Sequence, residues 1–404
     1  MVVGIGILYC LFSWLLGGYT LLRWPWLRLR LVLQRLALTA LAVLFTIVLG
    51  SWAFGVTAEQ VSLLNRSILL EWLGLQTVLG LASRLLLRWF SRASAKPLWQ
   101  LVAAPEHQKH VLREWQRNPF VRPPRLLTPS TFEPSLAQVT PSGRPLALAL
   151  APEIHHQLTE TTALEQLKSR GVLVTTLEDL AQRQLERLPP TLLPSNWLQI
   201  TDLPWSNEFS LQRKIKRTAD LVLALPLLVL MLPVMGVLAL AIWLEDRGPV
   251  VYVQQRTGWC GRPFKLYKLR TMRHTKNGAP TPWTTKADAR VTSVGAWLRR
   301  TRLDELPQLI NVIRGEMSLI GPRPEQPHFD EQLAADIPHY LKRYWMLPGL
   351  SGWAQVCGPA YPATLEESEL KLSYDLYYIR NWSLQLDLLI FAKTFKTLLK
   401  LRGV

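Results

Sequence analysis

The chain has 404 residues, of which 49% are hydrophobic, and its 46 lysines and arginines outnumber its 29 acidic residues, giving a formal net charge of +17. A chain of this length suggests two or three folding units. Long apolar runs and 17 tryptophans favour an anionic membrane surface and phosphorylated ligands over nucleic acid as the partner of the positive charge. Three widely separated cysteines, Cys10, Cys260 and Cys357, exclude a disulfide framework and zinc-ligand spacing and fit a reducing compartment.

The first hundred residues contain three hydrophobic segments, each long enough to span about 30 Å of hydrocarbon. They are residues 3–22, 36–56 and 67–87. The first two carry no charge, whereas the third contains Glu71 and Arg84, so Glu71 must lie near an interface or face another helix. The first segment lacks the charged start and small-residue cleavage site of a signal peptide. We therefore expect about three transmembrane helices in residues 1–97.

Basic residues around these segments predict their orientation. Positive charges gather after the first segment and at the end of the third: Arg23, Arg28, Arg30 and Arg35, then Arg84, Arg88, Arg92 and Lys96. The loop between the second and third segments carries only Glu59 and Arg66. The positive-inside rule then predicts an external N-terminus and a cytoplasmic location for everything after residue 97.

Residues 98–200 have the pattern of a soluble α/β domain. Strand-like runs, WQLVAAP from Trp99 and RPLALALAP from Arg144, alternate with helical patterns, which is typical of parallel strands joined by crossover helices. A nucleotide-binding version would need a glycine-rich turn after its first strand, and there is no glycine between Gln100 and Ser142. We expect a structural, oligomeric or regulatory role, with small-molecule sensing as the alternative.

The segment 214–247 contains a second kind of membrane signal. Its apolar run, Leu221–Trp243, would form a helix about 34 Å long, which is sufficient to cross a bilayer. Basic residues flank both ends, so the positive-inside rule favours neither direction. Pro226 and Pro233 interrupt the run, and proline inside a helix removes a backbone bond and bends the axis. These residues alone leave two possibilities open, a helix that crosses the bilayer and a bent helix that returns to the same face.

Two adjacent carboxylates, Asp304 and Glu305, lie in a strongly basic stretch. The surrounding cations are Arg299, Arg300, Arg302 and, in the later turn GPRP, Arg323. Carboxylates can hold Mg²⁺ or attack phosphorus while arginines neutralise phosphate oxygens, so this pattern suits phosphate chemistry. The alternative is a solvated helix start whose acidic pair offsets the helix dipole. Upstream, the block PFKLYKLRTM supplies Lys268 and Arg270 as candidates to grip a diphosphate.

Seven ordered blocks between Lys214 and the C-terminus give the chain a specific resemblance. The blocks are Lys216–Asp220, the apolar run to Trp243, Gly248–Gly258, Pro263–Met272, Arg302–Pro324, Pro348–Gly358 and Tyr374–Leu388. Together they resemble the bacterial sugar transferase family, which comprises polyprenyl-phosphate sugar-1-phosphate transferases. Cys357 departs from the pattern, since the family usually has asparagine there.

The resemblance implies a membrane protein of α-rich α/β class. Residues 98–200 would be the degenerate Rossmann-like domain of larger family members, and residues 201–404 a monotopic catalytic domain. The helix 214–247 would be re-entrant, breaking at Pro233 and returning to the cytoplasmic face. Leu232 stands where relatives often have a small polar residue, which weakens that bend.

The resemblance also implies the reaction. A sugar 1-phosphate would pass from a UDP-sugar to undecaprenyl phosphate at the cytoplasmic face of the bacterial inner membrane, releasing UMP. This step begins exopolysaccharide, capsule or O-antigen synthesis. Asp304 would be the nucleophile and Glu305 the ligand of Mg²⁺ or Mn²⁺. The residues expected to contact phosphate or headgroup are Arg256, Lys268, Arg270, Arg299, Arg302 and Arg323.

Further partners and alternatives complete these expectations. Trp353 could stack on uracil or anchor the protein at the membrane interface. Membrane lipids and a second copy of the chain are expected partners.

One alternative function is a catalytically inert membrane adaptor that recruits glycosyltransferases, which would tolerate loss of Asp304 or Arg323. Another is a channel or transporter, which would need more membrane spans.

Overall fold

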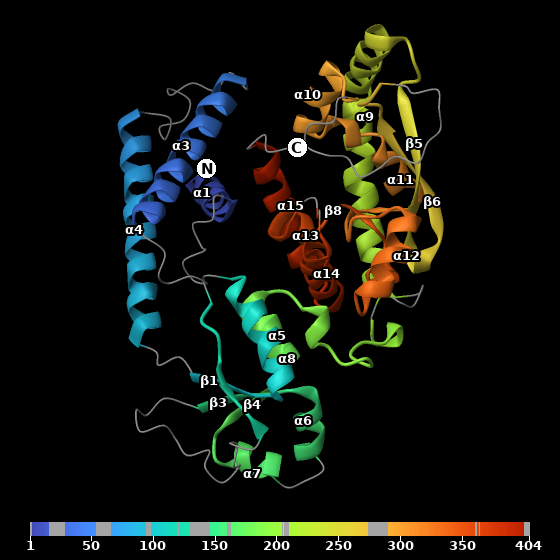
Figure 1. Ribbon diagram of the computed structural model, residues 1–404. Coiled ribbons are helices and arrows are strands. Elements are labelled where there is room, and N and C mark those ends of the chain that lie inside the picture. The colour runs from blue at the N-terminus through green and yellow to red at the C-terminus, as the bar shows by residue number, and fades with distance from the viewer. Residues whose placement is uncertain are drawn as a thin grey trace. The chain divides into compact units, whose positions relative to one another are not determined.

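The computed structural model describes most of the chain (Figure 1). The described residues are 2–15, 29–53, 66–93, 98–118, 121–129, 146–159, 163–203, 205, 210–273, 290–359, 362 and 364–399. They form two units, residues 1–98 with 138–146, and residues 99–137 with 147–404, and each unit is described by itself. Arg23, Arg28 and Lys96, which contributed to the predicted orientation, lie outside the described residues.

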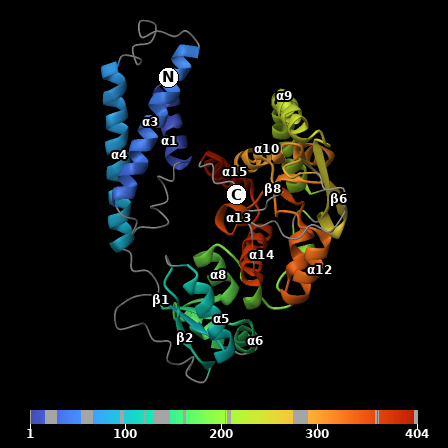
Figure 2. The ribbon, with the colours of Figure 1, turned by 45° about the horizontal axis from the view of Figure 1, so that its top comes forward.

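The N-terminal unit consists of three helices, α1 (Val2–Leu15), α3 (Leu29–Ala53) and α4 (Arg66–Ala93), which run side by side in Figures 1 and 2. Their shared core includes Ile5, Tyr9, Val43 and Leu73. Arg84, the charge within the third predicted segment, is buried in this unit. Its guanidinium donates to Ser13 Oγ at 2.6 Å and to the Gly80 carbonyl at 2.7 Å.

Among the described residues, two helices are long and apolar enough to cross a membrane, Leu33–Ser51 within α3 and the later helix Leu211–Asp246. Helix α1 contributes a shorter apolar stretch, Gly4–Ser13. These features support a membrane protein. The full count of three N-terminal crossings stays a prediction.

The next part is a small parallel sheet surrounded by helices (Figure 2). Its strands are β1 (Leu98–Val102), β2 (Arg125–Leu127), β3 (Leu146–Leu150) and β4 (Leu173–Thr176), in the order β2-β1-β3-β4. Its helices are α5 (Pro105–Gln116), α6 (Pro152–Thr159), α7 (Ala163–Ser169) and α8 (Leu177–Leu185). The parallel pairs have Leu101 opposite Leu126 and Ala149 opposite Thr175. The predicted parallel strands are confirmed, and the narrower Rossmann-like assignment stays a prediction.

Helix α9 (Leu211–Asp246) is a single helix of 36 residues that contains both Pro226 and Pro233 (Figure 1). The expected break in the helix at Pro233 is therefore wrong. A proline inside a helix removes one backbone hydrogen bond, and here the turns on either side keep their helical conformation. A helix of this length is about 54 Å long.

Residues near both ends of α9 contact the segments that follow the helix in the sequence. Near its start, Lys216 Nζ lies 2.7 Å from Asp387 Oδ2, and Arg217 donates to the carbonyls of Val312 and Ile313. At its end, the Asp246 carboxylate pairs with Arg270. Between these ends, Ala224, Leu238 and Ile242 are buried against the same fold. The helix is thus attached to one structure near both ends and at a few buried positions between them.

That structure is mostly helical, with two short pairs of strands. Strands β5 (Val251–Thr257) and β6 (Pro263–Leu269) form an antiparallel hairpin, and β7 (Ser318–Ile320) pairs in parallel with β8 (Gly349–Ser351). The α-helices are α10 (Ser293–Thr301), α11 (Gln308–Arg314), α12 (Pro327–Asp336), α13 (Trp353–Cys357), α14 (Leu365–Arg380) and α15 (Leu384–Leu399). Two 3₁₀ turns, η7 (Leu303–Glu305) and η8 (Tyr340–Trp345), matter for the site.

The β7–β8 pair depends on glycine, because the two backbones approach closely at its end. A Cβ atom built on Gly349 would lie 2.0 Å from the Gly321 nitrogen, which no side chain can tolerate. This contact brings the segment after β7 next to β8. The GPRP turn follows directly, so the glycines help to determine where Arg323 lies.

Candidate active site

Asp304 and Glu305 lie in the 3₁₀ turn η7, between α10 and α11. Arg302 has a left-handed backbone (φ 59°) that ends α10 and redirects the chain into this turn. Pro307 separates the turn from α11, so the carboxylates precede that helix instead of opening it as expected. Both side chains are mostly buried, at 9% and 8% exposure. Two adjacent buried carboxylates require nearby positive charge.

Arg323 provides most of that charge. Its Nη2 donates to Glu305 Oε1 at 2.6 Å and its Nη1 to Glu305 Oε2 at 3.3 Å, a two-point pairing of guanidinium and carboxylate. Arg302 Nη1 lies 3.9 Å from the same carboxylate. Among the described residues, none donates a hydrogen bond to the Asp304 carboxylate. One member of the acidic pair is therefore held by arginine, and the other is available for chemistry.

The surroundings move the pKa values of the two carboxyls in opposite directions. Burial, followed by the negative charge of Glu305, raises the pKa of Asp304. Burial also opposes ionisation of Glu305, but the charges of Arg323 and Lys268 and the hydrogen bonds from Arg323 outweigh it and lower the pKa of Glu305. Glu305 is thus kept ionised, whereas Asp304 is the more basic carboxylate.

Lys268 approaches this pair from strand β6, where it lies opposite Tyr252 of β5. Burial and the neighbouring charge of Arg323 lower its pKa to about 8, and the negative charges of Glu305 and Asp304 act in the opposite direction. Lys268 is therefore a cation whose charge depends on the two carboxylates beside it. It is suitably located to bind a phosphate there.

The remaining predicted cations divide into two groups. Arg256 donates to the Pro324 carbonyl at 3.1 Å, next to Arg323. The positive charge of Arg299 acts on Asp304, and its Nε donates to Thr271 Oγ1 at 2.9 Å. Arg270 differs, because its buried guanidinium pairs with Asp246 at the end of α9. The structure therefore brings together seven of the eight predicted residues, Arg256, Lys268, Arg299, Arg302, Asp304, Glu305 and Arg323, and gives Arg270 a structural contact.

Trp353 does not have the role expected of it. Its ring is 2% exposed, its Nε1 donates to the Glu186 carbonyl at 3.0 Å, and Lys393 Nζ lies 4.2 Å from the ring centroid. A ring enclosed in this way can neither stack on a base nor anchor at a membrane interface. Lys393 Nζ also donates to Cys357 Sγ at 3.2 Å, so the cysteine that departs from the family pattern has a polar contact.

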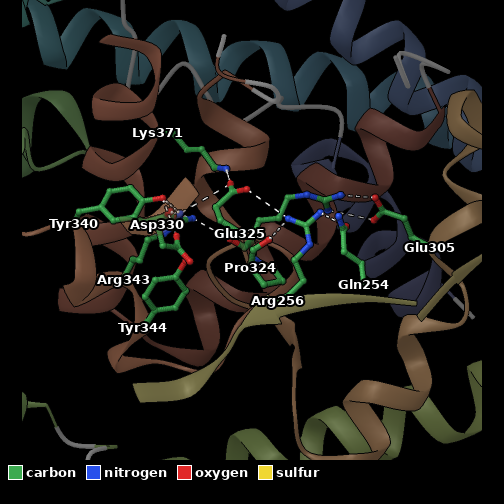
Figure 3. Close-up of polar contacts among 12 residues, drawn as sticks. Gln254, Arg256, Glu305, Pro324, Glu325, Asp330, Tyr340, Arg343, Tyr344 and Lys371 are labelled. Carbon is green, nitrogen blue, oxygen red and sulfur yellow. Dashed lines mark hydrogen bonds and ion pairs between the residues drawn. The ribbon is translucent and has the colours of Figure 1, made fainter. Parts of the chain in front are cut away.

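Sequence reasoning missed a second charged cluster beside the site (Figure 3). Its members are Glu325, Asp330, Tyr340, Arg343, Tyr344, Lys371 and Asp375. In Figure 3, Pro324 and Arg256 lie between Glu325 of this cluster and Glu305. The available signal was Glu325 itself, which directly follows GPRP. Lys371 and Asp375 are four residues apart on α14, but nothing in their spacing indicates what they contact.

Comparison with known proteins agrees with this geometry. The sequence model described as bacterial sugar transferase matches residues 211–401. Over 185 residues the chain is 44% identical to a UDP-N-acetylgalactosamine-undecaprenyl-phosphate N-acetylgalactosaminephosphotransferase of Aeromonas hydrophila, covering 46% of this chain and 44% of the relative. It is 44% identical over 186 residues to a UDP-glucose:undecaprenyl-phosphate glucose-1-phosphate transferase of Escherichia coli K12, covering 46% of this chain and 40% of that relative.

A relative from Caulobacter vibrioides, also named UDP-glucose:undecaprenyl-phosphate glucose-1-phosphate transferase, is matched over more of its length. Identity is 44% over 185 residues, covering 46% of this chain and 69% of the relative. The chain thus spans less than half of the first two relatives and more than two thirds of the third. The family model covers the region that contains the carboxylate pair and its cations. The chain belongs to the bacterial sugar transferase family.

Proposed function

We propose that this protein transfers a sugar 1-phosphate from a UDP-sugar to undecaprenyl phosphate and releases UMP. The observation that carries the proposal is the carboxylate of Asp304, to which no described residue donates a hydrogen bond, next to a carboxylate held by Arg323 and close to Lys268. The three relatives described above are named as undecaprenyl-phosphate transferases that use UDP-sugars, and the family model covers the region containing these residues. We assign the acceptor, undecaprenyl phosphate, and the donor class, UDP-sugars, from the names of those relatives.

In the first step, an Asp304 oxygen attacks the β-phosphorus of the UDP-sugar. A bond forms between this oxygen and phosphorus, and the bond from phosphorus to the bridging oxygen breaks, so that UMP leaves with the electron pair. In the second step, a phosphate oxygen of undecaprenyl phosphate attacks the same phosphorus and displaces Asp304. A carboxylate suits this role because it is ionised near neutral pH.

The cations have separate tasks in this scheme. Arg323 keeps Glu305 ionised and presents positive charge to the transferring phosphate. Lys268 adds a second cation from β6, and Arg299 and Arg302 come from the end of α10. Phosphoryl transfer depends mainly on such positioning and charge neutralisation. These partly buried cations are already in place when negative charge develops in the transition state.

A divalent cation fits this site together with substrate. No group of three or more His, Cys, Asp or Glu side chains able to enclose a metal occurs within the described ranges. Mg²⁺ is often held by one or two carboxylates with substrate phosphates and water. Asp304 and Glu305 match that donor set, since a carboxylate oxygen bonded to arginine retains a second lone pair. Mg²⁺ or Mn²⁺ held by Glu305 with help from Asp304 would neutralise charge on the diphosphate.

The membrane attachment that we propose keeps both ends of α9 on one side of the bilayer. Lys216, Arg217 and Asp246 all bind the same fold, and a crossing helix would carry one end to the opposite face. Exposed apolar side chains of α9 and of α15 then face lipid. They are Val222, Val229, Leu230 and Val237 on α9, and Leu388, Phe391 and Phe395 on α15. Because UDP-sugars are cytoplasmic, this face would be the cytoplasmic face of the inner membrane.

The nucleophile is tested by Asp304→Asn, which removes the attacking charge without changing size. We expect UMP release from a panel of UDP-sugars to fall by roughly 1,000-fold or more, because no other carboxylate replaces a missing nucleophile. The matched control is Asp336→Asn, which alters an exposed aspartate at the end of α12 and should leave activity unchanged. Substantial turnover by folded Asp304→Asn protein would contradict the covalent mechanism.

The pH dependence of kcat/KM tests Lys268. The lowered pKa of about 8 means that Lys268 loses its positive charge as pH rises through 8, so activity should decline there. Lys268→Arg stays charged and should move this decline to much higher pH. Lys265→Arg changes an exposed lysine of the same strand and should not move it. An unchanged alkaline limb in Lys268→Arg would remove Lys268 from its role.

On the acidic side of the kcat/KM profile, the raised pKa of Asp304 should cause activity to fall at a higher pH than for an ordinary aspartate.

Metal dependence tests Glu305. Activity should vanish in EDTA and return with Mg²⁺ or Mn²⁺. Glu305→Gln keeps an acceptor oxygen but loses the charge, so it should raise the Mg²⁺ concentration for half-maximal activity by roughly 10- to 100-fold. Full wild-type activity in chelator would exclude the metal from the reaction.

Labelling of cysteines tests the attachment of α9. Cys260 is exposed after the helix, and Leu211→Cys adds an exposed thiol at the start of the helix. With Cys10 and Cys357 replaced by serine, an impermeant maleimide should label either position only after cell lysis. Labelling of one position in intact cells would mean that α9 crosses the membrane.

A further inference from the structure

The segment Pro322–Glu325, called here the strap, has no regular secondary structure and yet is held at every carbonyl. Four donors from outside the strap bind its four consecutive carbonyl oxygens: Gly349 N to Pro322 O at 2.8 Å, Arg343 Nη2 to Arg323 O at 2.9 Å, Arg256 Nη1 to Pro324 O at 3.1 Å, and Thr257 N to Glu325 O at 3.0 Å. Two of the four residues are prolines, which restrict the backbone further. The strap is therefore a rigid mount for the Arg323 side chain.

Arg343 is the only one of these four donors that joins the strap to α14. Its Nη2 lies 2.9 Å from the Arg323 carbonyl and also 2.9 Å from Asp375 Oδ2. Its Nη1 donates to Tyr340 Oη at 2.8 Å, and its guanidinium lies 5.5 Å from the Tyr344 ring centroid. Arg343 is 2% exposed and Asp375 is 1% exposed, so this cation is enclosed by protein and cannot reach a substrate.

The end of the strap is anchored by charge as well. The Glu325 carboxylate pairs with Lys371, one turn before Asp375 on α14, and lies 3.6 Å from Arg256 and 3.9 Å from Arg343. Burial opposes ionisation of Glu325, but the charges of Lys371 and Arg343 outweigh it and lower its pKa to about 2. A buried charge of this kind is favourable only while its partners stay in place. The charged cluster in Figure 3 is therefore favourable only while its members keep these contacts.

We propose that Arg343 is a positioning residue for the transfer reaction, acting through the Arg323 carbonyl to direct the Arg323 guanidinium onto Glu305. The inference rests on the proposed function, since it assigns a task to a contact within that site. Arg343 fixes the backbone of the residue that binds the catalytic pair, and Asp375 fixes Arg343. A misplacement of about 1 Å remote from the reacting atoms can cost roughly 100-fold in rate. A buried guanidinium two contacts away from Glu305 can therefore control catalysis.

Hydrogen exchange tests the mount without reference to activity. Arg343→Lys keeps the charge but cannot bind Asp375 and the Arg323 carbonyl in the same forked geometry. The amides of Gly349 and Thr257, which donate to the strap, should exchange at least roughly 10-fold faster in this variant. The matched control is Arg187→Lys in the α/β part. Arg187 is also 2% exposed, pairs with a buried carboxylate, Glu114, and donates from Nη2 to a carbonyl at 2.7 Å. It should leave these two amides unchanged.

A double-mutant cycle tests the link to catalysis. Arg343→Lys should lower kcat/KM by roughly 10- to 100-fold in the wild-type background. In an Arg323→Ala background it should change kcat/KM by less than about 3-fold, because its effect passes through Arg323. Asp375→Asn, which is isosteric, should produce the same pattern more weakly and serves if Arg343→Lys does not fold.

The outcomes separate this inference from the proposed function. Equal losses of kcat/KM in the two backgrounds, or unchanged exchange at Gly349 and Thr257 in folded protein, would overturn the positioning role. An equal loss in Arg187→Lys would also overturn it, because it would reflect general destabilisation. Wild-type protein that releases UMP from no UDP-sugar would overturn the proposed function, and the exchange data would then still decide whether Arg343 holds the strap.

Discussion

The two-point contact between Arg323 and Glu305 is the interaction on which the site depends. A carboxylate that is 8% exposed would be destabilised by several kcal/mol without a partner, and bidentate pairing supplies one with fixed geometry. The two residues are 18 positions apart, so the pairing requires the intervening chain to return. This return begins with helix α11, which packs against α9. Strand β7 then pairs with β8, where Gly321 and Gly349 permit the close approach of the two backbones. The helices and short strands of this region thus serve to bring one guanidinium to one carboxylate.

This contact also divides the work between two adjacent carboxylates. Because Glu305 is held ionised by Arg323, its negative charge and the burial of the turn raise the pKa of Asp304. Neighbouring groups whose pKa values are pushed apart are a common basis for separate catalytic roles. The 3₁₀ turn matters here, since it directs two consecutive side chains into one site without the regular spacing of a helix. Lys268, with its pKa lowered to about 8, is tuned by the same charges.

Arginine has two distinct uses in this basic chain. Near the carboxylate pair it neutralises a buried acidic side chain, and elsewhere it joins segments that are distant in sequence. Arg217 caps carbonyls of α11, Arg270 binds the end of α9, and Arg343 connects α14 to the strap. A guanidinium suits this second use because its several donors can bind a carboxylate and a carbonyl together. Part of the high positive charge therefore serves to hold this mostly helical fold together.

The sequence by itself determined the membrane character, the parallel α/β pattern and most of the residues that gather at the candidate site. Apolar length, strand and helix periodicity, and the block around Asp304 and Glu305 are local properties, and local properties can be read from neighbouring residues. Only the tertiary structure decided that α9 continues through Pro233, that Arg270 turns away to Asp246 and that Trp353 is enclosed. It alone revealed the cluster of Arg343, Lys371 and Asp375, whose members come from η8 and α14. Charge and residue type do not specify a partner, because the partner of a buried cation is chosen by which segments pack together and by the need to pair every charge removed from water.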